Sequence, residues 1–158
     1  MTINKQMRLS EHMTLAELCK TSVKTEDGNI PSHVHIENLK RLCRWLEALR
    51  ERVGVPIIIN SGYRSPAVNR AVGGVPTSNH QTGCAVDIRV AGLDQAVQYA
   101  ATLLDISTQW CEDFDEIIIE RNARGTYWLH FAVRPEGNRR KIRMTSRLGV
   151  EKAKTAHH

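Results

Sequence analysis

Two histidines and one aspartate have the types and spacing that could hold a metal ion. His80 lies in the polar segment SNHQTG, and Asp87 follows it after a glycine that permits a tight bend. His130 lies farther along, in the largely apolar segment YWLHFAV. Two imidazole nitrogens and one carboxylate oxygen are a known catalytic zinc set that leaves a fourth position for water. This count makes the three residues candidate metal ligands.

Spacing alone is weak evidence for a metal site, because a histidine and an aspartate at this distance often occur by chance. His33 and His35 compete as ligands, although their place just before a helix favours an interpretation as polar helix-start residues. For Asp87 or His130 taken alone, a solvated position on an exposed sheet face is the simpler explanation.

Two predicted strands position the candidate ligands. In residues 85–90 the apolar side chains alternate with polar ones, so Asp87 lies opposite the apolar face. Residues 127–133 place Leu129 and Phe131 on one face and His130 on the other. Further elements are predicted as helices over 13–20, 36–53, 66–72 and 93–106, and as strands over 55–60, 115–120 and 141–144, with 115–120 and 127–133 forming a hairpin.

Composition indicates one ordinary globular domain. The 158 residues include 22 Lys and Arg against 17 Asp and Glu, a net charge of +5, and no repeat or linker divides residues 1–158. Acids are interspersed with the bases and no nucleic-acid motif is present, so a nucleic-acid partner is not expected. We expect no membrane span and no signal peptide. His157 and His158 are interpreted as a tag remnant.

Three segments together resemble the motifs of the M15 family of zinc peptidases, which includes D-Ala-D-Ala carboxypeptidases and L-alanyl-D-glutamate endopeptidases of phages and bacteria. The segments are SGYRSP from Ser61, SNHQTGCAVD from Ser78 and WLH from Trp128; MTLAE from Met13 resembles the short phage-type branch. The resemblance implies an α+β fold of the hedgehog and DD-peptidase type, with a small antiparallel sheet flanked by helices.

The same resemblance implies roles for individual residues. One zinc ion per chain would be held by His80, Asp87 and His130, and Arg64 would point at a substrate carboxylate or at the scissile carbonyl, unless it only braces its loop. Tyr63, Ser78 and Trp128 are expected to contact substrate, Ser78 also by orienting the loop of the first histidine.

One position departs from the family pattern. Many members carry the general base, Asp or Glu, three residues before the last histidine ligand, where this chain has Tyr127. A phenol is a poor base at neutral pH, and strand alternation turns Tyr127 away from His130. Glu120, at the end of the preceding predicted strand, is the substitute candidate, and a solvated strand-end acid is the equally weighted alternative.

The sequence therefore predicts a monomeric zinc peptidase that hydrolyses peptidoglycan stem peptides with a metal-activated water. The choice between carboxypeptidase and endopeptidase stays open. A noncatalytic metal-containing module that binds cell-wall peptide is the alternative, favoured by Tyr127. We expect synthesis in the cytoplasm and action on the cell wall, in a protein encoded by a phage, a prophage or a bacterium.

Overall fold

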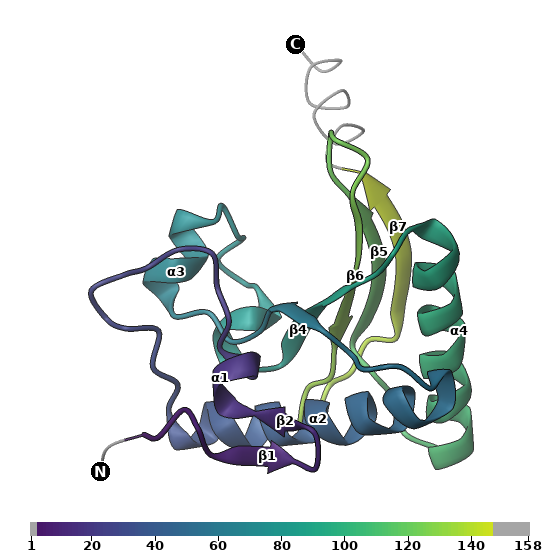
Figure 1. The fold of residues 1–158 in the computed structure, drawn as a ribbon, viewed down its shortest axis with the longest axis horizontal. Helices are drawn as coiled ribbons and strands as arrows, with labels where there is room; N and C mark the ends of the chain where they lie inside the picture. Colours follow the sequence, from purple (N-terminus) through teal and green to yellow (C-terminus); the bar gives the residue numbers. More distant parts are fainter. Residues whose placement is uncertain (1–2, 147–158) are drawn as a thin grey trace.

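The computed structural model describes residues 3–146, so His157 and His158 lie outside the described residues. Helices and strands of this part make up an α+β architecture (Figure 1). In chain order the elements are β1 (Arg8–Ser10), β2 (Met13–Thr14), α1 (Leu15–Leu18), α2 (His33–Val53), β3 (Ile59–Ser61), α3 (Pro66–Ala71), the 3-10 helix η1 (Asn79–Thr82), β4 (Ala85–Arg89), α4 (Leu93–Trp110), β5 (Glu116–Arg121), β6 (Tyr127–Ala132) and β7 (Lys141–Ser146).

A five-stranded sheet in the order β3-β4-β6-β5-β7 is the centre of the fold. The prediction of an antiparallel sheet is wrong in one respect, because β7 pairs parallel with β5. The reason is the path of residues 133–140: the chain leaves β6, crosses the start of β5 and returns on its far side. Arg140 has a positive φ of 52°, and the amide of Lys141 donates to Asp115 O at 2.9 Å. The first two strands form a separate antiparallel pair.

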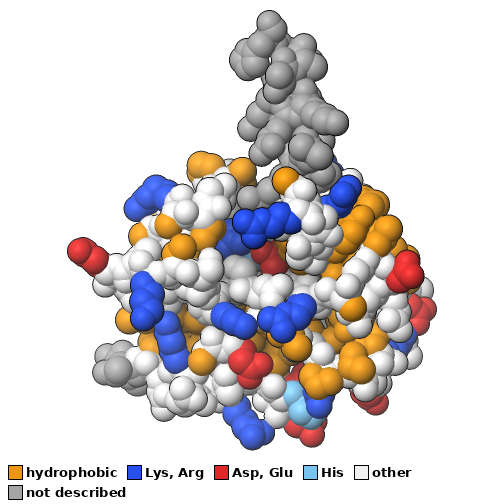
Figure 2. All heavy atoms as spheres, turned by 45° about the horizontal axis from the view of Figure 1, so that its top comes forward, with side chains coloured by type: hydrophobic (Ala, Val, Ile, Leu, Met, Phe, Trp, Pro, Cys, Tyr) orange, Lys and Arg blue, Asp and Glu red, His pale blue; other side chains and the backbone are white. Residues whose placement is uncertain are grey.

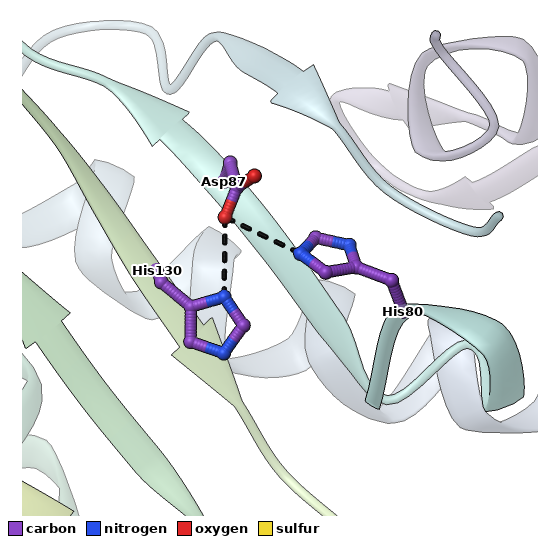
Figure 3. Close-up of side chains that lie close together, drawn as sticks. All are labelled: His80, Asp87 and His130. Carbon is purple, nitrogen blue, oxygen red and sulfur yellow. Dashed lines mark hydrogen bonds and ion pairs between the residues drawn. The ribbon is translucent and has the colours of Figure 1, made fainter. Parts of the chain in front are cut away.

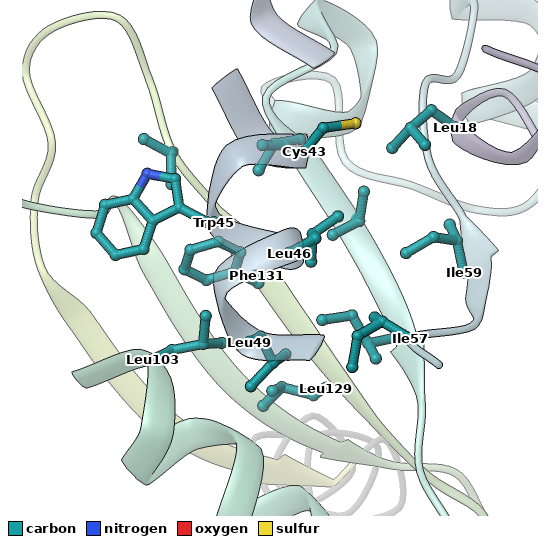
Figure 4. Packing of buried hydrophobic residues seen from close by; sticks show 14 of the residues in the cluster. Leu18, Cys43, Trp45, Leu46, Leu49, Ile57, Ile59, Leu103, Leu129 and Phe131 are labelled. Atoms are coloured by element: carbon teal, nitrogen blue, oxygen red, sulfur yellow. The ribbon is translucent and has the colours of Figure 1, made fainter. Parts of the chain in front are cut away.

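Helices α2 and α4 cover one face of the sheet and form the hydrophobic core with it (Figures 1 and 4). Helix α2 begins at His33, earlier than predicted, because the Ser32 side chain accepts from the amide of His35 and the His35 ring accepts from the amide of Ser32. It ends at Gly54 in the left-handed conformation. Among the described residues, no helix is long and apolar enough to cross a membrane.

The core-facing side chains follow the predicted alternation. Helix α2 buries every third or fourth residue, and β4, β5 and β6 bury alternate residues against it. Trp45 packs edge-on against Trp110, with ring centroids 5.0 Å apart. The residues of this layer include Leu39, Leu42, Cys43, Leu46, Leu49, Val86, Ile88, Ile117, Leu129 and Phe131.

The N-terminal segment is hydrogen-bonded to the chain that follows β3. The amide of Tyr63 donates to Leu18 O at 2.7 Å, which ties α1 to the chain leaving β3. A Cβ atom at Gly62 would lie 2.0 Å from the same carbonyl oxygen, so only glycine fits there. The predicted strand over 55–60 is shorter in the structure and starts at Ile59, since Val55 and Ile58 are exposed. Helix α1 begins with a capping box between Thr14 and Glu17.

Candidate metal centre

His80 is positioned by a short 3-10 helix with a polar start and a glycine end. The Ser78 hydroxyl accepts from the amide of His80 at 3.1 Å, which begins η1 and agrees with the orienting role expected for Ser78. Gly83 ends it with a φ of 75°, and a Cβ there would lie 2.6 Å from His35 O. This close approach to α2 requires glycine and directs His80, which is 3% exposed, toward the sheet.

Asp87 and His130 meet because of strand register. They are direct partners in the antiparallel pairing of β4 with β6, and Ile118 of β5 lies on the other side of His130. Side chains opposite each other in neighbouring strands share a face, here the face away from α2. The alternation in the sequence predicted these faces correctly, while the pairing brings the two side chains side by side.

The three candidate ligand atoms lie together (Figure 3). Oδ1 of Asp87 is 3.3 Å from Nε2 of His80 and 3.1 Å from Nδ1 of His130, and all three atoms lie within 4.8 Å of one another. Zinc bound tetrahedrally to nitrogen and oxygen at about 2.0–2.2 Å separates its ligand atoms by about 3.3–3.6 Å, close to the two distances from Asp87. The spacing and chemistry of this donor set therefore fit a zinc ion with one position left over.

Each of these side chains also has a partner that orients it. Nδ1 of His80 lies 2.8 Å from Gly62 O, so it donates there and leaves Nε2 for Asp87. Nη2 of Arg64 lies 3.3 Å from Oδ2 of Asp87, and Nε of Arg64 donates to the Ser61 hydroxyl. The structure thus places Arg64 against the carboxylate that faces both imidazoles.

A cleft of about 390 Å³ opens onto the three side chains. Glu116, Ile118 and Glu120, which alternate along β5, point to this side of the sheet. Figure 2 shows a recess on this face with an acidic side chain inside it and basic side chains at its edge. Other residues that line the cleft include Arg64, Ser78, Trp128, Arg139 and Lys141.

The carboxylates of the site differ in the direction in which their pKa is shifted. Burial alone would raise the pKa of Asp87, but the adjacent His80 and His130 lower it well below its ordinary value. Burial and the charge of Asp87 raise the pKa of Glu120. Burial would lower the pKa of His130, and its carboxylate neighbours Asp87 and Glu116 raise it instead. Glu120 is therefore the carboxyl of this set with the stronger tendency to hold a proton.

Several residues that the sequence singled out make structural contacts away from the cleft. Tyr63 is 3% exposed, stacks on His35 with centroids 4.9 Å apart and lies outside the set of described residues that line the cleft. Tyr127 packs against the core, as alternation predicted. His33 is the first residue of α2, and His35 belongs to its capping box.

Sequence reasoning missed two residues that surround His130. Oε1 of Glu116 lies 3.0 Å from Nε2 of His130, and the Asn79 amide donates to the same oxygen at 2.8 Å. The signal for Glu116 was present, because strand alternation places it on the same face of β5 as Glu120. Asn79 precedes His80 in the motif, with no pattern of its own to reveal its contact.

Comparison with protein-family models identifies a family for this chain. The model of the family described as Peptidase M15 matches residues 11–119, which include His80, Asp87 and Arg64. The matched span ends inside β5, so His130 lies beyond it and joins the site through the pairing of β6. No curated protein matches the chain.

Proposed function

The chain belongs to the peptidase M15 family, and we propose that it is a zinc-dependent peptidase that cleaves the stem peptides of bacterial peptidoglycan. The observation that carries the proposal is the convergence of His80, Asp87 and His130 at the floor of a cleft that also holds Glu120. A peptidase of this kind needs a metal site, an acid or base beside it and room for a peptide, and the cleft combines all three.

His80, Asp87 and His130 would hold the metal. When bound, zinc supplies Lewis acidity, which polarises a peptide carbonyl and makes a water molecule more acidic. The contacts behind the three side chains support this assignment. The outer nitrogen of each imidazole has an acceptor, and Arg64 lies against the second oxygen of Asp87. Side chains that are already oriented in this way lose less conformational freedom when they bind a metal.

Glu120 would move the proton. Its carboxylate accepts a proton from the attacking water and returns it to the nitrogen of the leaving amine. A raised pKa suits both halves of this transfer, since a very acidic carboxyl would be a weak base. From the neighbouring strand, Glu120 would thus replace the acid that many family members carry at the position of Tyr127.

Charge at the edge of the cleft supports an acidic peptide as substrate. Arg64, Arg139 and Lys141 line the cleft, and stem peptides carry free carboxylates. Arg64 can donate to a substrate carboxylate or to the scissile carbonyl while it holds Asp87, because a guanidinium carries five N–H donors. Trp128 forms a wall of the same cleft, where it would pack against the peptide.

The metal assignment is tested by titrating the dialysed protein with zinc. We expect one zinc ion per chain in the wild type and loss of stoichiometric binding in His80→Ala, Asp87→Ala and His130→Ala, with circular dichroism to confirm folding. A folded variant that still binds one zinc ion tightly would remove its residue from the ligand set.

The activity is tested by incubating the zinc-loaded protein with purified muropeptides and analysing the products by mass spectrometry. The masses report both cleavage and bond position, so carboxypeptidase and endopeptidase products are distinguished. A folded, zinc-loaded protein that binds muropeptides and leaves them uncut would instead support a noncatalytic wall-binding module, the alternative that Tyr127 favours.

A further inference from the structure

The imidazole of His130 lies between two carboxylates. Its Nδ1 faces Oδ1 of Asp87 at 3.1 Å, and its Nε2 faces Oε1 of Glu116 at 3.0 Å. The side chains of His130 and Glu116 are 11% and 16% exposed, so water competes little for this contact. A ring with both nitrogens engaged has a fixed orientation.

The arrangement repeats the one around His80. Nδ1 of His80 donates to Gly62 O, and its Nε2 faces Asp87. Each imidazole thus presents one nitrogen to Asp87 and gives the other to an outer acceptor. A neutral imidazole carries one N–H, and an outer acceptor holds that hydrogen on the outer nitrogen, which leaves the lone pair of the inner nitrogen for a metal.

Glu116 is itself held in place. The Asn79 amide donates to its Oε1 at 2.8 Å, and Arg139 lies 3.8 Å from its Oε2. Its partner in β6 is the small Ala132, which leaves room beside His130. Oε1 therefore contacts the strand that carries one candidate ligand and accepts from the 3-10 helix that carries another.

From these contacts we propose that Glu116 is a positioning residue for the metal centre, which accepts the Nε2 proton of His130 in a hydrogen bond and so directs Nδ1 toward the metal. The inference rests on the proposed function, since it requires His130 to be a ligand. Glu116 and Glu120, on either side of Ile118 in β5, then have different roles. Glu116 orients a metal ligand, and Glu120 transfers the proton.

The test compares Glu116→Ala and Glu116→Gln with the wild type in zinc affinity, measured by competition with a fluorescent chelator. Loss of an outer carboxylate on a metal-binding histidine typically weakens metal binding about 10–100-fold. We expect a change of this size for Glu116→Ala and a smaller one for Glu116→Gln, which keeps an acceptor oxygen. Glu51→Ala, on an exposed position of α2, is the matched control and should leave the zinc affinity unchanged.

A second readout is the protonation state of the His130 ring, from long-range proton–nitrogen NMR spectra of the zinc-loaded protein. The wild type should show the proton on Nε2. A merely structural Glu116 would lower the melting temperature of the metal-free variants and leave the zinc affinity of the folded protein unchanged, which would overturn the inference. A proton on Nδ1 in the wild type would also overturn it.

The two proposals fail in different ways. If the wild type binds no zinc, the proposed metal centre fails and this inference fails with it. If the wild type binds zinc and both Glu116 variants bind it equally well, the inference alone is refuted. Glu116→Gln preserves size and an acceptor, so it keeps the test available if the alanine variant does not fold.

Discussion

Asp115 supports a pH-dependent prediction about stability. Its carboxylate is fully buried and accepts from Nε and Nη2 of Arg139 at 3.0 and 2.8 Å and from the Asn79 amide at 2.7 Å, and Nε of Arg134 lies 3.2 Å away. Burial would raise the pKa of Asp115, but these partners lower it from 3.8 to about 2. Folding therefore favours the ionised carboxylate.

The size of the effect follows from linkage between protonation and folding. A group whose pKa is lowered in the folded state stabilises it above the unfolded pKa, and this contribution is lost as the pH falls through the folded pKa. With values of 3.8 and about 2, the contribution is about 2.4 kcal/mol at pH 7, about 1.3 at pH 3 and about 0.4 at pH 2. These are upper values, because the side chains of Arg134 and Arg139 are 32% and 39% exposed and salt screens them.

The perturbation is Asp115→Asn, which keeps the side-chain size and removes the charge. Urea unfolding of wild type and variant, followed by tryptophan fluorescence at low ionic strength with EDTA present, gives the difference in free energy of unfolding at each pH. Groups that titrate equally in both proteins cancel in this difference. We expect the difference to shrink by about 2 kcal/mol between pH 7 and pH 2.

The control is Asp113→Asn, which alters an exposed ion pair with Arg140 nearby and should change stability by less than about 1 kcal/mol at either pH. A wild-type advantage over Asp115→Asn that is equal at pH 7 and pH 2 would refute the reasoning. In that case the charge of Asp115 would contribute nothing to the network around Asn79 and Arg139.

Three further predictions concern the metal centre and its support. Glu120→Gln should keep zinc bound and lower the turnover number for muropeptide cleavage about 10²–10⁴-fold, and a full turnover number would place the base elsewhere. Gly62→Ala should destabilise the protein by about 1–3 kcal/mol in urea unfolding, because its Cβ would meet Leu18 O at 2.0 Å, and should weaken zinc binding by moving the carbonyl that holds His80. Gly54→Ala puts alanine into left-handed backbone but brings its Cβ within 4 Å of no atom, so it should lower stability and leave the zinc affinity unchanged; an equal loss of zinc affinity in both variants would contradict this. Free zinc at about 100 times its dissociation constant should add about 2.7 kcal/mol of stability, so EDTA should lower the melting temperature by about 5–10 °C in calorimetry, and an unchanged temperature would argue against a metal bound to the folded state.

Strand alternation made much of the candidate site predictable. A period of two residues placed Asp87 and His130 opposite the apolar faces of their strands, and the structure confirms both faces. The tight bend at Gly83 was likewise expected from the sequence, and the structure places this glycine in the left-handed conformation. These features are local, so a few neighbouring residues suffice to determine them.

Features that depend on distant parts of the chain were not predictable. Strand β7 pairs parallel with β5 because of a connection whose path the sequence pattern does not specify. The contact of Arg64 with Asp87 joins residues far apart in the chain, and the contact of Glu116 with His130 depends on the pairing of β5 with β6. Periodicity identifies the face of a strand, but it does not identify the neighbour on that face.

The register of β4 against β6 has a consequence for folding. A slip of one residue would turn His130 toward the apolar layer of α2 and would turn Leu129 and Phe131 into the cleft. An imidazole in that layer would lose its carboxylate partners and its solvation, and two large apolar side chains would become exposed. A metal ion bound across the two strands would oppose the slip further. The polar residues of the cleft therefore help to select the correct pairing of the sheet while the chain folds.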